Sequence, residues 1–234
     1  MNDTTIIIPT YNEAKNIEAI IEAIFSNVPE VKILVVDDNS PDGTADIVRG
    51  LVKKNANISL LFREKKEGLG KAYIHAFTHL LTFPNVRTVV MMDADFSHNP
   101  KYLPLFIKQS DVFDLLVGSR YILGGQTEGW EFWRRFLSRG ANIYAGTITG
   151  LPVSDLTGGF NLIRTDLLRK IDFSQIDASG YAFQIELKYM LCKKGARCKE
   201  LPILFTNRRE GESKMNKHII GEGILAPWKM ILKK

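Results

Sequence analysis

The chain has 234 residues, of which 45% are hydrophobic and 24% are charged, and this composition excludes a disordered or collagen-like protein. No apolar run reaches the ~20 residues that span a bilayer, and the N-terminus lacks the residue succession of a signal peptide. We therefore expect neither a secreted precursor nor an integral membrane protein. Two cysteines, Cys192 and Cys198, are too few for a disulfide framework and fit a reducing compartment, and for the same reason we expect no zinc site.

The formal net charge of +5 is spread unevenly along the chain. Residues 1–196 carry 22 basic and 22 acidic side chains, whereas residues 197–234 carry nine basic and four acidic ones. A nucleic-acid-binding protein typically spreads basic and aromatic residues over one face. A neutral body with a basic tail therefore argues against nucleic acid as a partner.

The first half alternates between short apolar runs and amphipathic stretches. Runs rich in β-branched residues predict strands, and apolar residues at positions i, i+3, i+4 and i+7 predict helices. Strands are expected at residues 5–9, 31–36, 58–62, 88–92 and 115–118, and helices around residues 17–25, 47–52, 72–81, 131–149 and 182–194. Because the strand runs are apolar throughout, both faces of the sheet should be covered, as in a mostly parallel α/β domain.

Polar residues follow three of these strands at their carboxyl ends, where open α/β sheets bind ligands. The three segments are Thr10-Tyr11-Asn12-Glu13, Asp37-Asp38-Asn39-Ser40 and Asp93-Ala94-Asp95. We expect them to converge on one edge of the sheet. Helix capping is the alternative for any single residue, such as Asn12 or Asp42, but three acidic segments together favour a ligand site.

Asp93 and Asp95 are candidate ligands of a metal ion. In an extended chain both carboxylates point to one side, and Mg²⁺ typically takes one or two carboxylates together with substrate phosphates. A solvated turn is the alternative. Arg120 and the basic residues of segment 208–214 supply cations that bind phosphate. The combination predicts a diphosphate ligand.

Several motifs resemble the family 2 glycosyltransferases of the GT-A fold. They are Pro9-Thr10-Tyr11-Asn12-Glu13, Val35-Val36-Asp37-Asp38-Asn39-Ser40-Pro41-Asp42-Gly43, Asp93-Ala94-Asp95-Phe96-Ser97-His98-Asn99-Pro100 and Gly118-Ser119-Arg120-Tyr121. Three further motifs are similar to those of the polyprenol-phosphate (dolichol-phosphate) mannosyltransferases: Asp155-Leu156-Thr157-Gly158-Gly159-Phe160, Gly180-Tyr181-Ala182-Phe183-Gln184 and Arg208-x-x-Gly211-x-Ser213-Lys214. The resemblance runs from residue 6 to about residue 215. It implies a mostly parallel central sheet flanked by helices, with a single nucleotide-sugar-binding domain over residues 1–213.

The resemblance also implies a role for individual residues. Contacts with the donor nucleotide sugar are implied for Pro9, Tyr11, Glu13, Val36, Asp38, Asp93, Ala94, Asp95, Arg120, Arg208 and Lys214. Ligands of Mg²⁺ or Mn²⁺ would be Asp93, Asp95 and Ser97, where some relatives carry Gln. The acceptor side would comprise Arg134, Arg135, Ser138, Arg139 and Gln184. Asp95, Arg120 and Asp155 are the catalytic candidates, with helix capping or loop anchoring as the alternative for Asp155.

The implied activity is an inverting transfer of mannose from GDP-mannose to a polyprenyl or dolichyl phosphate. The second pKa of a phosphomonoester lies near ~6, so the acceptor is mostly a dianion at neutral pH and needs no strong general base. A metal ion and basic side chains would stabilise the departing nucleoside diphosphate. The alternatives are UDP-glucose or another sugar nucleotide with a lipid phosphate or glycan acceptor and, more remotely, a non-catalytic binding protein.

Segment 214–234 interleaves apolar residues with lysines. Such a basic amphipathic segment predicts contact with an anionic membrane surface, although Gly221, Gly223 and Pro227 weaken a continuous helix, and packing against the domain is the alternative. Phe132 is expected in the core, and Trp130 and Trp133 at an aromatic rim. We therefore expect a cytoplasmic, peripherally membrane-associated enzyme that reaches its lipid by surface contact or through a small membrane-anchoring partner subunit.

Overall fold

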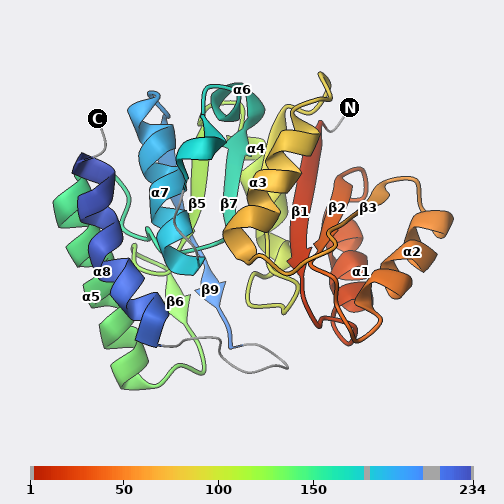
Figure 1. The fold of residues 1–234 in the computed structure, drawn as a ribbon, viewed down its shortest axis with the longest axis horizontal. Helices are drawn as coiled ribbons and strands as arrows, with labels where there is room; N and C mark the ends of the chain where they lie inside the picture. The colour runs from red at the N-terminus through yellow and green to blue at the C-terminus, as the bar shows by residue number, and fades with distance from the viewer. Residues whose placement is uncertain (1–2, 177–179, 208–216, 233–234) are drawn as a thin grey trace.

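The structure is a computed structural model in which residues 3–176, 180–207 and 217–232 are described. One sheet of seven strands forms the centre, in the order β3-β2-β1-β4-β7-β5-β8, and helices cover both of its faces (Figure 1). All neighbouring strands run parallel except β7, which is antiparallel to both β4 and β5. The expected mostly parallel α/β sheet is confirmed.

The strands of the sheet are β1 (Thr4–Thr10), β2 (Lys32–Asp37), β3 (Ile58–Phe62), β4 (Thr88–Met91), β5 (Leu115–Ser119), β7 (Asn161–Arg164) and β8 (Cys198–Pro202). A separate parallel pair consists of β6 (Gln126–Thr127) and β9 (Leu204–Phe205). The helices are α1 (Ile17–Asn27), α2 (Thr44–Lys54), α3 (Leu69–Leu80), α4 (Leu103–Gln109), α5 (Phe132–Thr149), α6 (Thr165–Leu168), α7 (Gly180–Lys193) and α8 (Lys217–Leu232). Two 3₁₀ turns are η1 (Pro100–Tyr102) and η2 (Phe173–Gln175).

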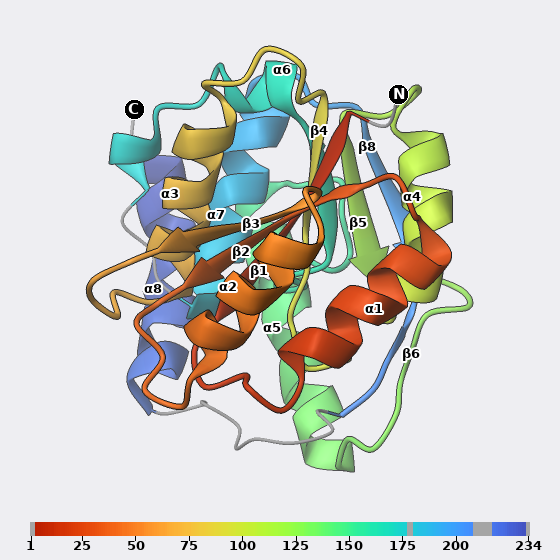
Figure 2. The same cartoon turned by 90° about the vertical axis from the view of Figure 1, so that its right-hand side faces the viewer.

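Alternate residues of each central strand enter two different cores. Ile6 and Ile8 of β1 pack with α1, α2 and α4, whereas Ile7 packs with α3 and α7 on the opposite face. Figure 2 shows α1 and α4 on one side of the sheet and α3, α7 and α8 on the other. Because successive side chains of a strand point to opposite faces, a strand covered on both sides is apolar throughout, which explains the unbroken apolar runs.

The second half of the chain departs from the βα rhythm at β7 and at the two outer helices. α5 and α8 pack against each other, and α8 also packs against α7 (Figure 1). The glycines and the proline of the tail, which weaken a helix, do not prevent one here, because α8 runs from Lys217 to Leu232 with Pro227 inside it. Ala226 and Met230 of α8 are buried in the core on the α7 side.

Candidate active site

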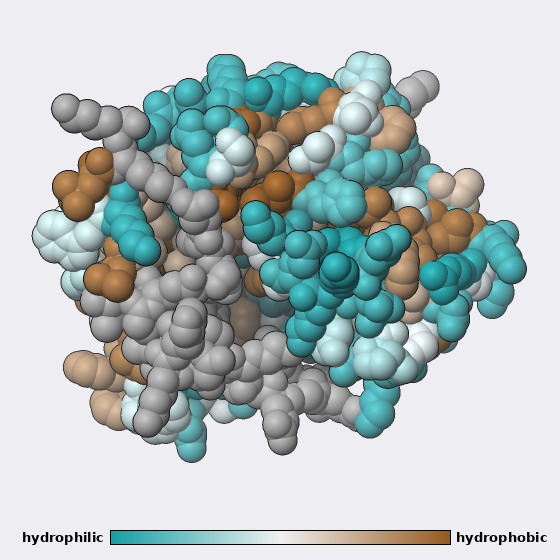
Figure 3. All heavy atoms as spheres, viewed as in Figure 1, coloured by the Kyte–Doolittle hydropathy of each residue, from teal (hydrophilic) through white to brown (hydrophobic). Residues whose placement is uncertain are grey.

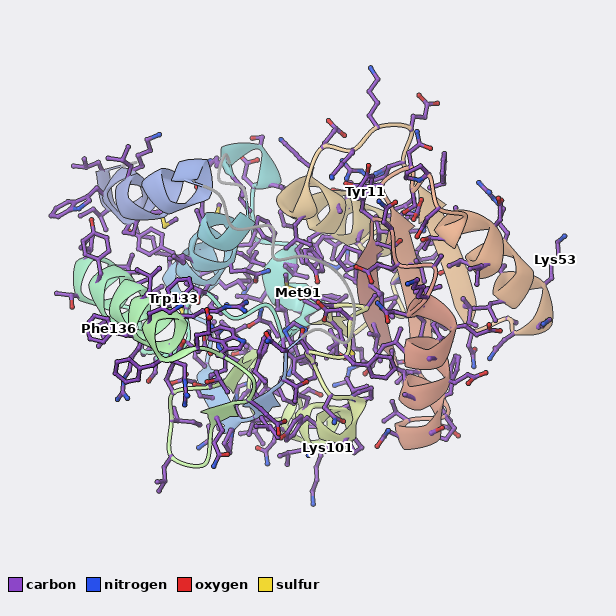
Figure 4. All side chains as sticks on the ribbon, turned by 90° about the horizontal axis from the view of Figure 1, so that it is seen from below. Tyr11, Lys53, Met91, Lys101, Trp133 and Phe136 are labelled. Carbon is purple, nitrogen blue, oxygen red and sulfur yellow. The ribbon has the colours of Figure 1, made fainter. Side chains whose placement is uncertain are left out.

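The polar segments after β1, β2 and β4 lie at one edge of the sheet. These three strands are parallel neighbours, so their carboxyl ends meet, and the convergence expected from the sequence is confirmed. Figure 4 looks onto this edge, with Met91 near its centre at the end of β4. Asn12 and Asn39, in two of these segments, and Phe96, directly after the third, have φ angles of 62°, 56° and 63°. Non-glycine residues seldom adopt this left-handed conformation, and it concentrates at functional sites.

The end of β2 carries two buried aspartates with different partners. Asp37 accepts hydrogen bonds from Thr10 Oγ1 at 2.8 Å and from the backbone N–H and Oγ of Ser40 at 2.9 and 2.6 Å. Asp38 instead forms an ion pair with Arg63, which is also buried. Asp37 therefore ties two of the loops together, and Asp38 is held in place by a cation at the end of β3. The predicted contact of Asp38 with the donor stays a prediction.

The segment after β1 is fixed to the loop after β2. The N–H of Ala14 donates to Asp42 at 3.0 Å, and the N–H of Glu13 donates to Thr44 Oγ1 at 3.0 Å. Asp42 also accepts from the N–H and the hydroxyl of Thr44, the first residue of α2, and so braces the start of this helix from the position before its N-cap, Gly43. The ammonium of Lys66 lies 3.6 Å from the ring centroid of Tyr11. Tyr11 and Glu13 thus belong to a braced loop at the predicted donor side.

Of the remaining residues predicted to contact the donor, Val36 and Ala94 are buried and Pro9 is half-buried. Any contact by Val36 or Ala94 would therefore run through the adjoining backbone, whereas Pro9 keeps part of its ring accessible. Arg208 and Lys214, both predicted to contact phosphate, lie outside the described residues.

We expected an extended chain at Asp93-Ala94-Asp95, and this expectation is wrong. Strand β4 ends at Met91 and the chain then bends. Asp95 is buried and accepts the N–H of Ser97 at 3.0 Å, whereas the side chain of Asp93 is 31% exposed. The N–H of Asp93 donates to Nδ1 of His98 at 3.0 Å. Burial lowers the pKa of His98, so the ring is neutral and carries its proton on Nε2.

The oxygen atoms at this corner suit a hard divalent cation. Asp93 and Asp95 supply carboxylates, and the buried Oγ of Ser97 has no hydrogen-bond partner among the described residues. Within the same residues, no group of three or more His, Cys, Asp or Glu side chains could hold a metal ion by itself. The corner therefore fits Mg²⁺ or Mn²⁺ that completes its coordination with the oxygens of a bound ligand.

A buried ion pair joins Arg120, after β5, to Asp155. The N–H and Nε of Arg120 donate to Asp155 Oδ2 at 3.0 and 2.7 Å, and Nη2 donates to Oδ1 at 2.7 Å. Burial raises the pKa of Asp155, but the charge of Arg120 and its hydrogen bonds outweigh that effect and hold the pKa below its usual value. Asp155 therefore acts as the loop anchor considered from the sequence and fixes the plane of the Arg120 guanidinium.

Phe205 connects this ion pair to the acidic corner. Its ring centroid lies 5.4 Å from Cζ of Arg120 and 5.6 Å from the ring centroid of His98. The charges of Asp93, Asp95, Arg120 and Asp155 all act on His98. The three catalytic candidates therefore all act electrostatically on one buried imidazole.

The loop of residues 154–158, which carries Asp155, is gripped by side chains from three elements. Asn142 of α5 accepts the N–H groups of residues 156 and 157 at 2.7 and 3.0 Å. Glu200 of β8 accepts those of residues 154 and 155 at 2.8 and 3.0 Å. Lys188 of α7 donates to the carbonyls of residues 156 and 158 at 3.1 and 2.7 Å. The position of Asp155 is thus set by the fold rather than by its own loop.

Two expectations for the start of α5 are wrong. Trp130 is buried, where it lies 5.4 Å from Cζ of Arg120, whereas Phe132 is 80% exposed. Trp133 is exposed as expected (Figure 4). Helix α5 begins at Phe132, so Trp130 precedes the helix and turns inward, while the first helical turn faces away from the core.

The predicted acceptor residues do not all share one environment. Arg134 stacks on Trp130, with Cζ 4.2 Å from the ring centroid, and donates to Asn207. The Oγ of Ser138 accepts a hydrogen bond from the hydroxyl of Tyr121 at 2.6 Å. Arg135 and Arg139 are exposed on α5. Gln184 is buried, and its Oε1 accepts from Asn161 at 3.1 Å, so any role in acceptor binding would be indirect.

Sequence reasoning missed Arg63, His98, Asn142 and Lys188. Each is buried and joined to a predicted site residue or to its loop. The one available signal was for His98, which lies within the motif that starts at Asp93.

Comparisons with known proteins agree with this geometry. The glycosyl transferase family 2 profile matches residues 5–172. The chain belongs to this family, and the resemblance found in the sequence is confirmed. One relative, named undecaprenyl-phosphate mannosyltransferase, from Micrococcus luteus, is 38% identical over 94% of this chain and 90% of its own length. Another, the polyprenol monophosphomannose synthase of Mycolicibacterium smegmatis, is 39% identical over 96% of this chain and 86% of its own.

Solved structures share the fold at lower identity. Glucosyl-3-phosphoglycerate synthase from Mycobacterium tuberculosis, in complex with phosphoglyceric acid, has a TM-score of 0.67 and 16% identity over 96% of this chain and 79% of that one. The same enzyme with Mn²⁺ and UDP-glucose has a TM-score of 0.66 and 18% identity over 97% and 76%. These similarities confirm the expected GT-A-type fold.

Proposed function

We propose that this chain transfers mannose from GDP-mannose to the phosphate of a polyprenyl lipid. The observation that carries the proposal is that the corner of Asp93 and Asp95 is linked to the Arg120–Asp155 pair through the rings of His98 and Phe205. Two mannosyltransferase relatives at 38% and 39% identity support the transferred sugar and the lipid phosphate acceptor. GDP as the nucleotide rests on the resemblance seen in the sequence.

The proposed reaction is a single displacement. An oxygen of the lipid phosphate forms a bond to the anomeric carbon while the bond to the nucleoside diphosphate breaks, which inverts the configuration. No strong base is required because the acceptor phosphate is largely dianionic at neutral pH. Arg120, oriented by Asp155, stabilises charge on phosphate oxygens. Mg²⁺ or Mn²⁺ at Asp93 and Asp95, with Ser97 beside them, would supply Lewis-acid stabilisation of the leaving diphosphate.

The lipid acceptor requires contact with a membrane, and α5 and α8 carry suitable surfaces. Their exposed apolar side chains are Phe132, Trp133, Phe136, Leu137, Ile143 and Tyr144 of α5 and Leu225, Trp228, Ile231 and Leu232 of α8. Brown side chains along the left edge of Figure 3 lie where these helices run. Arg135 and Arg139 add positive charge that suits anionic lipids. Among the described residues, no helix has both the length and the apolarity to cross a bilayer.

A transfer assay tests the activity. Purified protein, Mg²⁺ or Mn²⁺ and polyprenyl phosphate in vesicles are incubated with labelled GDP-mannose, GDP-glucose, UDP-glucose or UDP-N-acetylglucosamine, and label in the lipid phase is counted. We expect label from GDP-mannose above all others. Label from a UDP-sugar alone would establish the alternative donor, and no label from any donor would refute lipid glycosylation.

The site assignment has its own variants. Asp95→Asn removes the charge of the buried carboxylate and should abolish metal-dependent transfer. Asp46→Asn makes the same chemical change at an exposed position of α2 and should leave transfer unchanged. Full activity of Asp95→Asn, measured on protein that unfolds at the wild-type temperature, would show that the metal site lies elsewhere. A membrane-anchoring partner subunit would be indicated if transfer needed native membranes rather than pure lipid vesicles.

A further inference from the structure

Lys188 is a fully buried lysine that the proposed reaction does not use. It lies on α7 with 1% of its surface exposed, and its ammonium donates to the carbonyls of Leu156 at 3.1 Å and Gly158 at 2.7 Å. Lysine is almost never fully buried without a partner, because its charge must leave water. A methionine would fill a similar volume at no such cost. The position therefore calls for the amine itself.

The two carbonyls that Lys188 holds flank the functional part of the loop. Asp155 precedes Leu156, and Thr157, between the two carbonyls, accepts from Nη2 of Arg120 at 2.9 Å. Asp155 and Thr157, which both accept hydrogen bonds from the guanidinium of Arg120, therefore lie in or next to the short segment that Lys188 fixes. Among the described residues, the hydrogen bonds of the Lys188 amine go to backbone carbonyls and none goes to a carboxylate.

Resting on the proposed function, we propose that Lys188 is a positioning residue that holds residues 155–158 so that Arg120 is aimed at the phosphate groups of the substrates. The lysine acts through the backbone carbonyls of Leu156 and Gly158, and Arg120 is the group that meets the phosphates. A displacement of about 1 Å at a reacting group can cost ~10²-fold in rate. Loss of this single amine should therefore be visible in turnover.

The charge state of Lys188 changes within the physiological pH range. Burial lowers the pKa of Lys188 to about 7. The charge of Arg120 lowers this pKa further, whereas Asp155, Cys192 and Glu200 raise it. These are the titratable groups that act on it from the loop, α7, β8 and the end of β5. The charged ammonium is a stronger hydrogen-bond donor to carbonyls than the neutral amine, so Lys188 holds the loop more strongly below pH 7 than above it.

The test compares Lys188→Met with Lys193→Met, which removes an exposed lysine from the same helix. We expect kcat to fall about 100-fold in Lys188→Met, with a smaller change in the KM for the donor, and to be unchanged in Lys193→Met. The ratio of wild-type to Lys188→Met activity should be larger at pH 6 than at pH 8. A ratio that is constant with pH, or a kcat per folded molecule within about threefold of wild type, would overturn the proposal.

Coupling to Arg120 separates positioning from a general structural role. If Lys188 acts through Arg120, adding Lys188→Met to Arg120→Ala should change activity by less than about threefold, because the effects of residues that act as a unit are not additive. Fully additive losses would refute the assignment. Should Lys188→Met fail to fold, Lys188→Gln retains an N–H donor and should show the same non-additivity.

The affinity for Mn²⁺–GDP can be measured without sugar transfer, so it tests the role of Lys188 separately from the proposed donor and acceptor. If wild-type protein transfers no sugar, the proposed function fails, and Lys188 is judged by diphosphate affinity alone. We then expect about tenfold weaker binding in Lys188→Met, again without additivity to Arg120→Ala. Equal affinity in wild type and Lys188→Met would overturn the positioning role whatever the reaction.

Discussion

The Arg120–Asp155 pair allows a quantitative prediction. The Asp155 side chain has no exposed surface and that of Arg120 is 5% exposed, so neither charge is screened by water. Asp155→Asn keeps the shape of the side chain but removes its charge, which leaves the guanidinium buried without a counter-ion. The same loss releases the loop that Asp155 anchors.

The magnitude follows from the geometry of the pair. Two unit charges about 4 Å apart attract each other by ~4 kcal/mol at an effective dielectric constant near 20. Removal of one partner of a buried pair costs about 3–5 kcal/mol in measured cases. A chain of this size loses about 2–4 °C in Tm per kcal/mol. We therefore expect Asp155→Asn to unfold about 6–20 °C below wild type.

Thermal unfolding followed by circular dichroism, on Asp155→Asn, Arg120→Leu and the double variant, measures the coupling between the two side chains. A coupling energy below about 1 kcal/mol is the value expected for an exposed pair and would refute the reasoning. Acid provides a second readout. Because the folded-state pKa of Asp155 is lowered, the stability from the pair is present above the unfolded pKa and is lost as pH falls through the folded value. The difference between wild type and Asp155→Asn should therefore shrink in strong acid.

Three further predictions concern other parts of the chain. Gly158→Ala places a Cβ 3.0 Å from Asp155 Oδ1, so we expect about 1–3 kcal/mol of destabilisation in chemical denaturation. Gly140→Ala, in open space on α5, should instead stabilise the fold by about 0.5–1 kcal/mol in the same assay. Phe136→Ser removes a 74% exposed ring from α5 and should weaken binding to anionic vesicles, measured by sedimentation. Phe83→Ser removes a 43% exposed ring from another part of the fold and should not weaken it, so equal losses would argue against a membrane face on α5. Ser97→Ala should raise the Mn²⁺ concentration for half-maximal activity about tenfold, and an unchanged titration would exclude the hydroxyl from the metal site.

The strands of the first half could be predicted because each is covered on both faces and therefore reads as an apolar run. β7 could not be predicted in the same way. It has only four residues, and its pairing with β4 joins positions at least 70 residues apart in the chain, from Met91 with Asn161 to Thr88 with Arg164. A strand this short is defined by its neighbours rather than by its own pattern.

The acidic segments of the site were readable because each follows a predictable strand. Their partners were not. Arg63 and Lys188 stand in the sequence as ordinary charged residues, and only the tertiary structure shows that both are buried. The exchange of roles between Trp130 and Phe132 has a similar cause. Trp130 precedes α5 and turns inward, whereas Phe132 is the first residue of the helix and faces away from the core, and the sequence pattern does not show which ring does which.

The antiparallel strand β7 also bears on how the chain folds. In the described sheet, β7 lies between the group β3-β2-β1-β4 and the pair β5-β8, so the backbone hydrogen bonds that join these two parts of the sheet run through β7. During synthesis the first group is complete before β7 emerges, whereas β5 has to wait for a partner that follows much later. Pairing between distant segments is slow because loop closure must be paid for in chain entropy. The loop of residues 154–158, which positions Arg120, lies directly before β7 in the chain. The binding edge should therefore be among the last parts of the molecule to become ordered.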